Sequence, residues 1–291
     1  MSLTPFPLNR GRRGPDWRAF GERLDRNPTW RAARISATTI YALLLREAVT
    51  RYGRRSAGYV WSLIEPLLQL TVMLTVFGFI GRSPAVGESL VVFFITGIMP
   101  LMSFRNAINR GARAITSNRS LMNYPQVRAF EIITARVLLE LLTSAMVVFI
   151  IALFTKAFFA LPFTAWVDNP LELEGALLVL ALLCYGAGFL SAQIGRFFNQ
   201  WSDLTRALGR LLFFTSGVWY TLDTLPAGLR KYVAYNPLAQ VIEWIRDAAI
   251  PGFESQHVSA FYPIAFAVVC LVIGLFIEWL FQFTGLELER G

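Results

Sequence analysis

Residues 44–67, LLREAVTRYGRRSAGYVWSLIEPL, join a basic amphipathic segment directly to an apolar one. In and just before the first half, apolar side chains recur at helical spacing while charged and polar side chains fill the opposite face. The apolar positions are Tyr41, Leu44, Leu45, Ala48 and Tyr52, and the polar ones are Arg46, Glu47, Thr50, Arg51, Arg54 and Arg55. The pattern predicts an amphipathic helix over residues 41–55 that lies on the cytoplasmic side of a bilayer. A membrane span then opens with Glu65 and Pro66.

Composition places the whole chain in a membrane. Hydrophobic residues make up 55% of the 291 residues and charged residues only 16%, whereas a soluble domain has about 25% charged residues. Apolar runs are spread over residues 59–283, so we expect one membrane domain at residues 35–285 and a cytoplasmic tail at 286–291. Cys184 and Cys270 fall inside apolar runs and are expected to pack there without a disulfide.

The excess positive charge lies before the first apolar run. Residues 1–61 hold twelve arginines against four acidic residues, and residues 62–291 hold fifteen basic and fifteen acidic residues. By the positive-inside rule the N-terminus is cytoplasmic, so the basicity indicates topology and no nucleic acid partner. Residues 1–34 lack a signal-peptide core and are expected to form an arginine-rich cytoplasmic extension. In a second interpretation, the basic helix only orients the first span.

Six apolar runs can form membrane spans. They cover residues 59–80, 89–104, 132–158, 175–195, 211–222 and 258–283. The second continues into a helix that carries Arg105, Arg110 and Arg113, and the fifth has to extend back through Arg206 and Arg210 to reach the required length. With both termini cytoplasmic, the predicted fold is an all-α integral membrane protein of six spans that follow an interface helix.

A half-length helix is predicted between the fifth and sixth spans. Asn236 and Pro237 form a helix start, and Pro251 with Gly252 form a stop. The apolar face between them consists of Leu238, Val241, Ile242, Ile245 and Ala249. A span needs about twenty residues, so this shorter segment is interpreted as a re-entrant or interfacial helix on the periplasmic side.

The segment TSNRSLMNYPQVR, residues 116–128, returns the chain to the cytoplasmic face between the second and third spans. Asn118 or the serine before it is expected to cap a short helix. The exposed tip of that helix would carry Leu121, Met122 and Tyr124, and apolar side chains at the tip of a polar loop indicate a docking surface. The alternative is a loop that folds its own leucine and methionine under the helix bundle.

Missing motifs exclude several enzyme classes. No GxxxxGK[ST] loop occurs, so the chain is not itself a P-loop ATPase. His257 is the only histidine, which excludes zinc sites with two or more histidines, and no GxSxG motif is present. No catalytic residue, metal site or cofactor is therefore predicted. The outer carboxylates are interpreted as solvated residues: Asp168, Glu172, Glu174, Asp223, Glu243, Asp247 and Glu254.

Three acidic residues lie within or at the ends of spans, where an unpaired charge costs on the order of several kcal/mol. Glu140 has Arg136 one helical turn away as a local partner. Glu65 and Glu278 lie near the inner ends of the first and last spans, and their carboxylates are expected to reach the interface by snorkelling.

Aromatic residues make up 14% of the chain and are candidates for lining a conduit. Flat aromatic faces suit the apolar C–H surfaces of sugar rings, so such a conduit would pass a glycan without gripping any one hydroxyl. The candidate lining residues are Trp61, Phe77, Phe213, Phe214, Trp219 and Tyr220. Interfacial aromatic belts account for such residues equally well.

Three blocks of the sequence resemble one family. The runs LLLREAVTRYGRRSAGYVWSLIEPL, TSNRSLMNYPQV and YNPLAQVIEWIRDAAIPGF are similar to membrane subunits of ABC-2 type polysaccharide exporters, and most of all to the permease of group 2 capsular polysaccharide export. The resemblance covers about residues 35–283, and the extension before it departs from the family pattern. It implies export of lipid-linked capsular polysaccharide across the bacterial inner membrane, with O-antigen or teichoic acid export as alternatives.

The resemblance also implies a homodimer that works with a separate cytoplasmic ATPase, which binds ATP and magnesium. The interface helix would touch that ATPase through Tyr41, Arg46, Glu47, Arg51 and Arg54. The first inner loop would be the coupling helix, through Asn118, Arg119, Leu121, Met122 and Tyr124. Residues 226–252 would form paired re-entrant helices, and capsule systems add a periplasmic copolymerase and an outer-membrane channel.

Two rival functions stay open at this point. A membrane-embedded glycan transferase would need one of the outer carboxylates for catalysis. A secondary transporter would depend on a proton gradient and would work without an ATPase partner. The absence of paired inverted repeats in the chain counts against the transporter.

Overall fold

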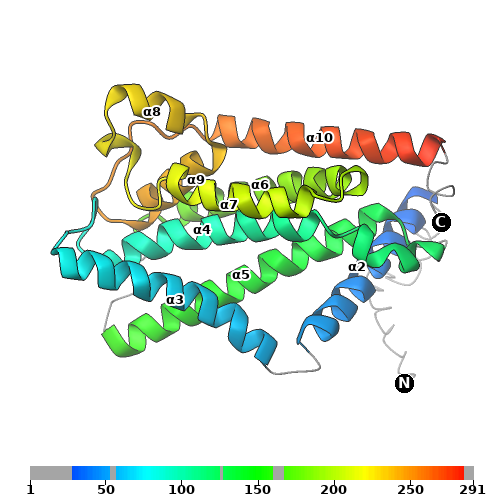
Figure 1. Ribbon diagram of the computed structural model, residues 1–291, viewed down its shortest axis with the longest axis horizontal. Coiled ribbons are helices and arrows are strands. Elements are labelled where there is room, and N and C mark those ends of the chain that lie inside the picture. The colour runs from blue at the N-terminus through cyan, green and yellow to red at the C-terminus, as the bar shows by residue number, and fades with distance from the viewer. Residues whose placement is uncertain (1–27, 53–56, 125–126, 160–166, 285–291) are drawn as a thin grey trace, which may run out of the picture.

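The computed structural model describes residues 28–52, 57–124, 127–159 and 167–284, and the regular elements in that part are all helices. In chain order they are α2 (Pro28–Tyr52), α3 (Ala57–Ile80), α4 (Leu90–Gly111), η1 (Thr116–Asn123), α5 (Ala129–Phe159), α6 (Pro170–Phe197), α7 (Trp201–Thr215), η3 (Leu222–Thr224), α8 (Ala227–Ala234), α9 (Pro237–Ala249) and α10 (Phe261–Thr284). The long helices form an elongated bundle, with α2 at one end and α8 and α9 at the other (Figure 1). The prediction of an all-α fold is confirmed.

Four described helices are long and apolar enough to cross a membrane, namely α4, α5, α6 and α10. The described apolar part of α3 is shorter, at Ile64–Ile80, and α7 has 15 residues, which at 1.5 Å each cover about 22 Å of a roughly 30 Å hydrocarbon core. α7 extends back past Arg210, as expected, but it ends at Thr215 because the chain turns at Gly217, whose φ is +75°. The continuous span predicted at 211–222 is wrong, and the count of six spans stays a prediction.

α4 is the central helix of the bundle. Every residue from Val92 to Phe104 is buried, which is the pattern of a helix surrounded on all sides. Its start is capped by Ser89, whose side chain accepts a hydrogen bond from the backbone N–H of Val92. α3, α5, α6, α7 and α9 all contact α4. These five helices are therefore positioned against α4.

α6 approaches its neighbours through glycines. A Cβ atom added at Gly195 would collide with the carbonyl oxygen of Ala112, just beyond α4. One added at Gly186 would collide with the carbonyl oxygen of Ala267 in α10. Helix backbones come this close only where a side chain is absent, and small residues at such contacts are typical of membrane helices.

Replacing Gly186 or Gly195 by alanine should destabilise the bundle, because it forces two backbones apart. The expected cost is about 1–3 kcal/mol, as in overpacked cores. Gly228→Ala is the matched control, since nothing lies within 4 Å of a Cβ added there. Thermal unfolding in detergent should give lower midpoints for the first two variants only. Equal midpoints in all three variants would contradict the close packing.

Ion pairs between helices lie toward the η1 end of the bundle. Three of them are Arg105–Glu65 between α4 and α3 at 2.8 Å, Arg110–Glu140 between α4 and α5 at 2.6 Å, and Arg196–Glu278 between α6 and α10 at 3.2 Å. Glu140 and Glu278 are 2% and 5% exposed, and buried carboxylates need a partner. The predicted local partner of Glu140 is therefore wrong, and so is the snorkelling predicted for Glu278, because a neighbouring helix supplies each partner.

α2 begins earlier than the sequence predicts. The helix starts at Pro28, a residue well suited to a first helical turn, so residues 28–34 belong to α2 and not to the extension. α2 ends at Tyr52 and α3 begins at Ala57. Arg54 and Arg55 lie outside the described residues. α2 packs along α5.

The half-length helix between the last spans is confirmed as α9. Pro237 opens it, and the side chain of Asn236 accepts a hydrogen bond from the backbone N–H of Leu238 at 3.0 Å. The helix ends at Ala249 after 13 residues, two residues before Pro251 and its turn. All five residues of the predicted apolar face are buried.

Candidate functional site

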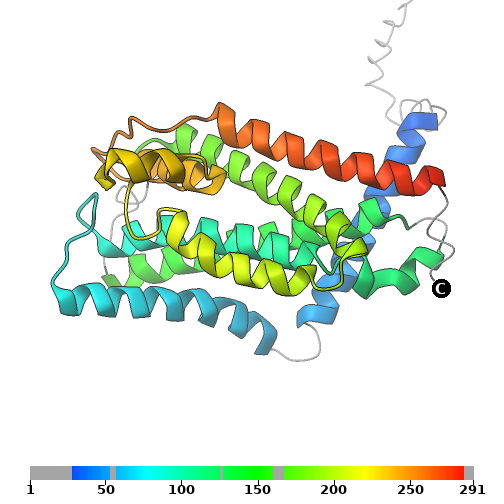
Figure 2. The same cartoon turned by 45° about the horizontal axis from the view of Figure 1, so that its top comes forward.

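The predicted interface helix and the predicted inner loop lie together at one end of the bundle, as α2 and η1 (Figures 1 and 2). η1 follows the end of α4 and precedes the start of α5. α2 runs along α5 beside it. α2 and η1 are separated by about 70 residues in the chain and meet here, where their side chains are joined by a hydrogen bond.

The start of η1 differs from the prediction. Ile115 occupies the cap position, with no side-chain hydrogen bond. The Ser117 hydroxyl donates to the carbonyl of Arg113 at 2.5 Å, and the Asn118 amide donates to the carbonyl of Ala114 at 3.0 Å. The predicted cap is wrong because both side chains turn back onto carbonyl oxygens of the preceding turn.

The exposed tip of η1 is more polar than predicted. Asn118 is 5% exposed, and its Oδ1 accepts a hydrogen bond from Arg46 of α2 at 3.3 Å. Leu121 and Met122 are half-buried. Met122 packs on a small apolar cluster formed by Ala114, Ile115, Ala129, Ile133, Val137, Phe189 and Ala192. Of the five predicted coupling residues, Arg119 and Tyr124 have exposed side chains.

Arg136 of α5 joins α2, η1 and α5. Its Nε and Nη2 donate to one carboxylate oxygen of Glu47 at 3.1 and 2.8 Å. Its Nη1 donates to the carbonyl of Arg113 at 3.0 Å and to the Ser117 hydroxyl at 2.8 Å. We call this set of contacts the Arg136 junction. The Arg136–Glu47 ion pair of this junction is only partly exposed, so water screens it less than a pair on the surface.

The inward face of α2 is rotated relative to the predicted apolar face. Leu44 and Ala48 are half-buried, but Tyr41 and Leu45 are exposed. The half-buried positions follow one helical stripe: Ser36, Thr39, Ile40, Leu43, Leu44, Glu47 and Ala48. Glu47 belongs to this stripe because Arg136 lies beneath it. The side chains of Arg51 and Tyr52 lie outside the described set.

The structure brings four of the six candidate conduit residues together. The rings of Phe213 and Phe214 lie 5.0 and 5.5 Å from that of Trp219, and the Tyr220 hydroxyl donates to the carbonyl of Phe214 at 3.0 Å. Phe214 is 61% exposed. We call these four residues the aromatic cluster. It closes the end of α7 that faces α8 and α9.

The other two candidates lie apart from the cluster. Phe77 is buried at 6% exposure, and its ring meets that of Phe94 edge-on at 4.9 Å. It belongs to the packed core between α3 and α4. The side chain of Trp61 lies outside the described set. Among the candidate conduit residues whose side chains are described, those of the aromatic cluster therefore form the open aromatic surface.

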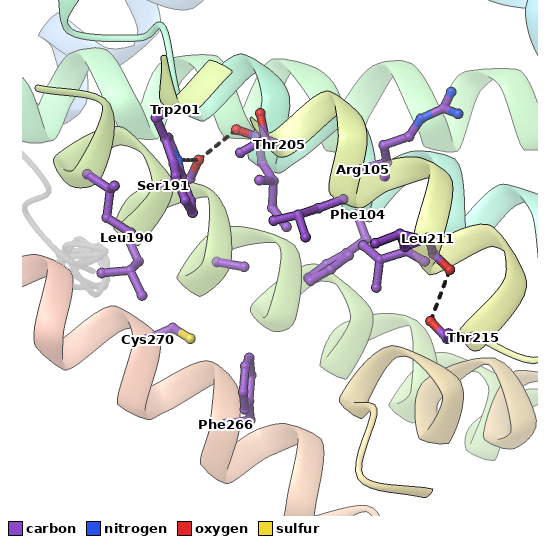
Figure 3. A pocket seen from close by; sticks show the side chains of 16 residues that line it. Phe104, Arg105, Leu190, Ser191, Trp201, Thr205, Leu211, Thr215, Phe266 and Cys270 are labelled. Atoms are coloured by element: carbon purple, nitrogen blue, oxygen red, sulfur yellow. Dashed lines mark hydrogen bonds between the residues drawn. The ribbon is translucent and has the colours of Figure 1, made fainter. Parts of the chain in front are cut away.

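A groove lies beside α7, which runs along α4 between α3 and α10 (Figure 2). Its volume is about 320 Å³. Its lining is mostly apolar and includes Phe104, Leu190, Trp201, Leu211, Phe266 and Cys270 (Figure 3). The Ser191 hydroxyl at its edge accepts a hydrogen bond from the Trp201 ring N–H at 2.8 Å. The groove shows that α7 is packed loosely on the α10 side.

Sequence reasoning missed two buried charged residues on α9, Glu243 and Arg246. Arg246 is fully buried and donates to the carbonyls of Gly217, Val218 and Tyr220 at 2.5–2.9 Å. Glu243 is 1% exposed. The interpretation of Glu243 as a solvated outer carboxylate is therefore wrong. Burial raises the pKa of Glu243 to about 7, and the charge of Arg246 opposes that rise. The signal in the sequence was an acid and an arginine three residues apart on a short amphipathic helix.

Arg246→Met should destabilise the end that carries α9. The change leaves three carbonyl groups without their donor and removes the positive charge near Glu243. A buried polar group left unsatisfied costs about 1–3 kcal/mol. Lys231→Met is the control, because Lys231 is exposed on α8. Thermal unfolding should show a clearly lower midpoint for Arg246→Met alone. Matching midpoints would show that Arg246 does not hold the 217–220 turn.

The long apolar helices make this chain an integral membrane protein, and the sequence carries no nucleotide-binding loop of its own. The chain belongs to the ABC-2 type transporter family, whose sequence profile matches residues 38–250. That match covers α3–α9 and most of α2.

Several curated relatives of the chain are capsule or polysaccharide export proteins. It is 33% identical over 248 residues to the polysialic acid transport protein KpsM of Escherichia coli, covering 83% of this chain and 92% of the relative. It is 29% identical to the capsule polysaccharide export inner-membrane protein CtrC of Neisseria meningitidis serogroup A, covering 83% and 90%. It is also 29% identical to the capsule polysaccharide export inner-membrane protein BexB of Haemophilus influenzae, with the same coverage.

Proposed function

We propose that the chain is the transmembrane permease subunit of an ATP-binding cassette exporter that moves lipid-linked capsular polysaccharide across the bacterial inner membrane. The observation that carries the proposal is similarity to capsule exporters over 83% of the chain. The chain is a transport subunit of its family and is no enzyme in this account. A partner ATPase binds ATP and magnesium.

The charge distribution supports a topology with both termini in the cytoplasm. The start of α2 and the end of α10 lie at the same end of the bundle as η1 (Figure 1). That end carries most of the arginines of the described inner segments: Arg105, Arg110, Arg113, Arg119, Arg128, Arg136 and Arg196. Because cytoplasmic flanks collect arginine, we assign this end to the cytoplasm and α8 and α9 to the periplasm. α3 and α7 then complete six spans.

The coupling route begins where α2 and η1 face the partner ATPase. Closure of the ATPase dimer on ATP pushes the exposed Tyr124 and Arg119. The Arg136 junction passes that displacement to α5, and the Arg110–Glu140 pair passes it to α4. The bundle then shifts as a rigid body to open a path. The nucleotide state of the partner supplies the free energy for the shift.

Two copies of the chain enclose the conduit in this proposal. Exposed apolar side chains on α3 and α7 support a second copy: Leu68, Val72, Phe79, Leu204, Leu208, Leu211 and Phe214. The aromatic cluster at the end of α7 would present flat faces to the sugar rings. α8 and α9 would form the re-entrant pair on the periplasmic side, below a copolymerase and an outer-membrane channel.

The test is complementation of a strain that lacks this gene with Arg119→Glu/Tyr124→Ala. The proposal predicts loss of surface capsule, accumulation of the polysaccharide inside the cell, and at least tenfold weaker retention of the ATPase in a pull-down. A tenfold loss corresponds to about 1.4 kcal/mol, the scale of an interface tyrosine. These positions are better targets than Leu121 and Met122, because Met122 also packs on the bundle.

Lys231→Glu is the control, since this exposed charge change lies at the opposite end. It should leave capsule and pull-down unchanged. If cells with the double variant still carry surface capsule and the variant retains the ATPase fully, the coupling role of η1 is overturned. If a strain that lacks the gene shows unchanged surface glycan, the export function is overturned. Loss of all glycan synthesis after replacing one outer carboxylate, such as Glu172, would favour the transferase.

A further inference from the structure

A cavity of about 560 Å³ lies between α2, α5 and α10. It is formed by the first part of α2, the start of α5 and the last turns of α10. Its principal lining residues are Ser36, Arg128, Glu131, Leu275, Glu278 and Trp279. The transport route proposed above uses none of this lining.

Glu131 brings a buried carboxylate to the wall of the cavity. It is 5% exposed. One carboxylate oxygen accepts a hydrogen bond from the Ser36 hydroxyl at 2.7 Å, and the other accepts one from the backbone N–H of Arg128 at 2.9 Å. Both donors are neutral, and no ion pair of Glu131 occurs within the described ranges. Glu278 differs, because Arg196 neutralises it. A buried carboxylate without a cation favours a cationic ligand.

The remaining wall is both basic and apolar. The Arg128 side chain is exposed one helical turn from Glu131 and forms no ion pair with a described residue. Trp279 is 55% exposed and Leu275 38% exposed on α10. These residues lie where α5 and α10 leave the apolar part of their spans, which is the depth of lipid headgroups and of interfacial tryptophans. The cavity thus offers an anionic group, a cationic group and an apolar wall in one place.

We propose that this cavity binds an aminophospholipid of the surrounding bilayer, with its ammonium group on Glu131, its phosphate on Arg128 and an acyl chain along Leu275 and Trp279. A primary ammonium donates hydrogen bonds to a carboxylate, as a lysine does. A trimethylammonium headgroup has no N–H to donate. The site therefore selects ethanolamine over choline. The proposal rests on the membrane location of α5 and α10 and does not depend on the exported cargo.

The test is native mass spectrometry of the purified full-length chain after exchange into detergent with defined lipids. The probes are phosphatidylethanolamine, phosphatidylcholine and phosphatidylglycerol with identical acyl chains. The wild-type chain should retain the ethanolamine lipid at least tenfold better than either of the others. Glu131→Gln should abolish that preference, because the amide keeps the shape of the side chain and loses its charge. Arg128→Gln should weaken the retention of the ethanolamine lipid.

Two further variants separate binding from folding. Ser36→Ala removes one hydrogen bond to Glu131 but keeps the charge, so it should keep the preference. Glu65→Gln removes an acid on α3, outside the cavity lining, and should also keep it. Equal retention of the three lipids by the wild-type chain, or an ethanolamine preference that survives Glu131→Gln, would overturn the proposal. A wild-type chain that retains none of the three lipids would also overturn the proposal.

Discussion

The structure depends on arginine–carboxylate pairs that join different helices at one end of a membrane bundle. A charge within the apolar part of a membrane protein is tolerated only with a partner, so each of these pairs fixes the position of two helices at once. The pair between Arg136 and Glu47 differs from the others, because it ties the membrane span α5 to a helix outside the core. Arg136 also holds η1 through Ser117 and the carbonyl of Arg113. A force applied to either peripheral segment therefore reaches the span directly.

The opposite end is held in a different way. There Arg246 of α9 binds the carbonyl groups of the turn that follows α7, and its guanidinium stacks on the ring of Phe93 at 4.1 Å. This single side chain joins α9, the 217–220 turn and the central helix α4. The aromatic cluster is carried by that same turn. Glycine contacts let the backbone of α6 lie close to those of α4 and α10.

The features that sequence predicted well are those that local chemistry determines. α9 follows from an asparagine cap, a first-turn proline and an apolar face of fixed spacing, and the structure confirms all three. The gathering of Phe213, Phe214, Trp219 and Tyr220 also follows from their nearness in sequence. The all-α membrane fold follows from hydropathy alone.

The features that sequence failed to predict depend on contacts between distant segments. Helical spacing suggested Arg136 as the partner of Glu140, but packing of α4 against α5 supplies Arg110 instead. Glu47 was placed on the solvated face of its helix because nothing in the local pattern reveals the arginine beneath it. Met122 was expected at an exposed tip, yet it covers a small apolar cluster that two helices and a loop build together.

In the proposed mechanism, the Arg136 junction transmits motion from the η1 end of the bundle into α5. The most direct measurement is the amount of polysaccharide exported per ATP hydrolysed for Glu47→Arg, for Arg136→Glu and for the double variant that exchanges the two charges. Each single variant should lower the ratio of polysaccharide exported to ATP hydrolysed several-fold while the ATPase still binds. The double variant should restore much of that ratio. An unchanged ratio in both single variants, or a double variant no better than either one, would contradict the account.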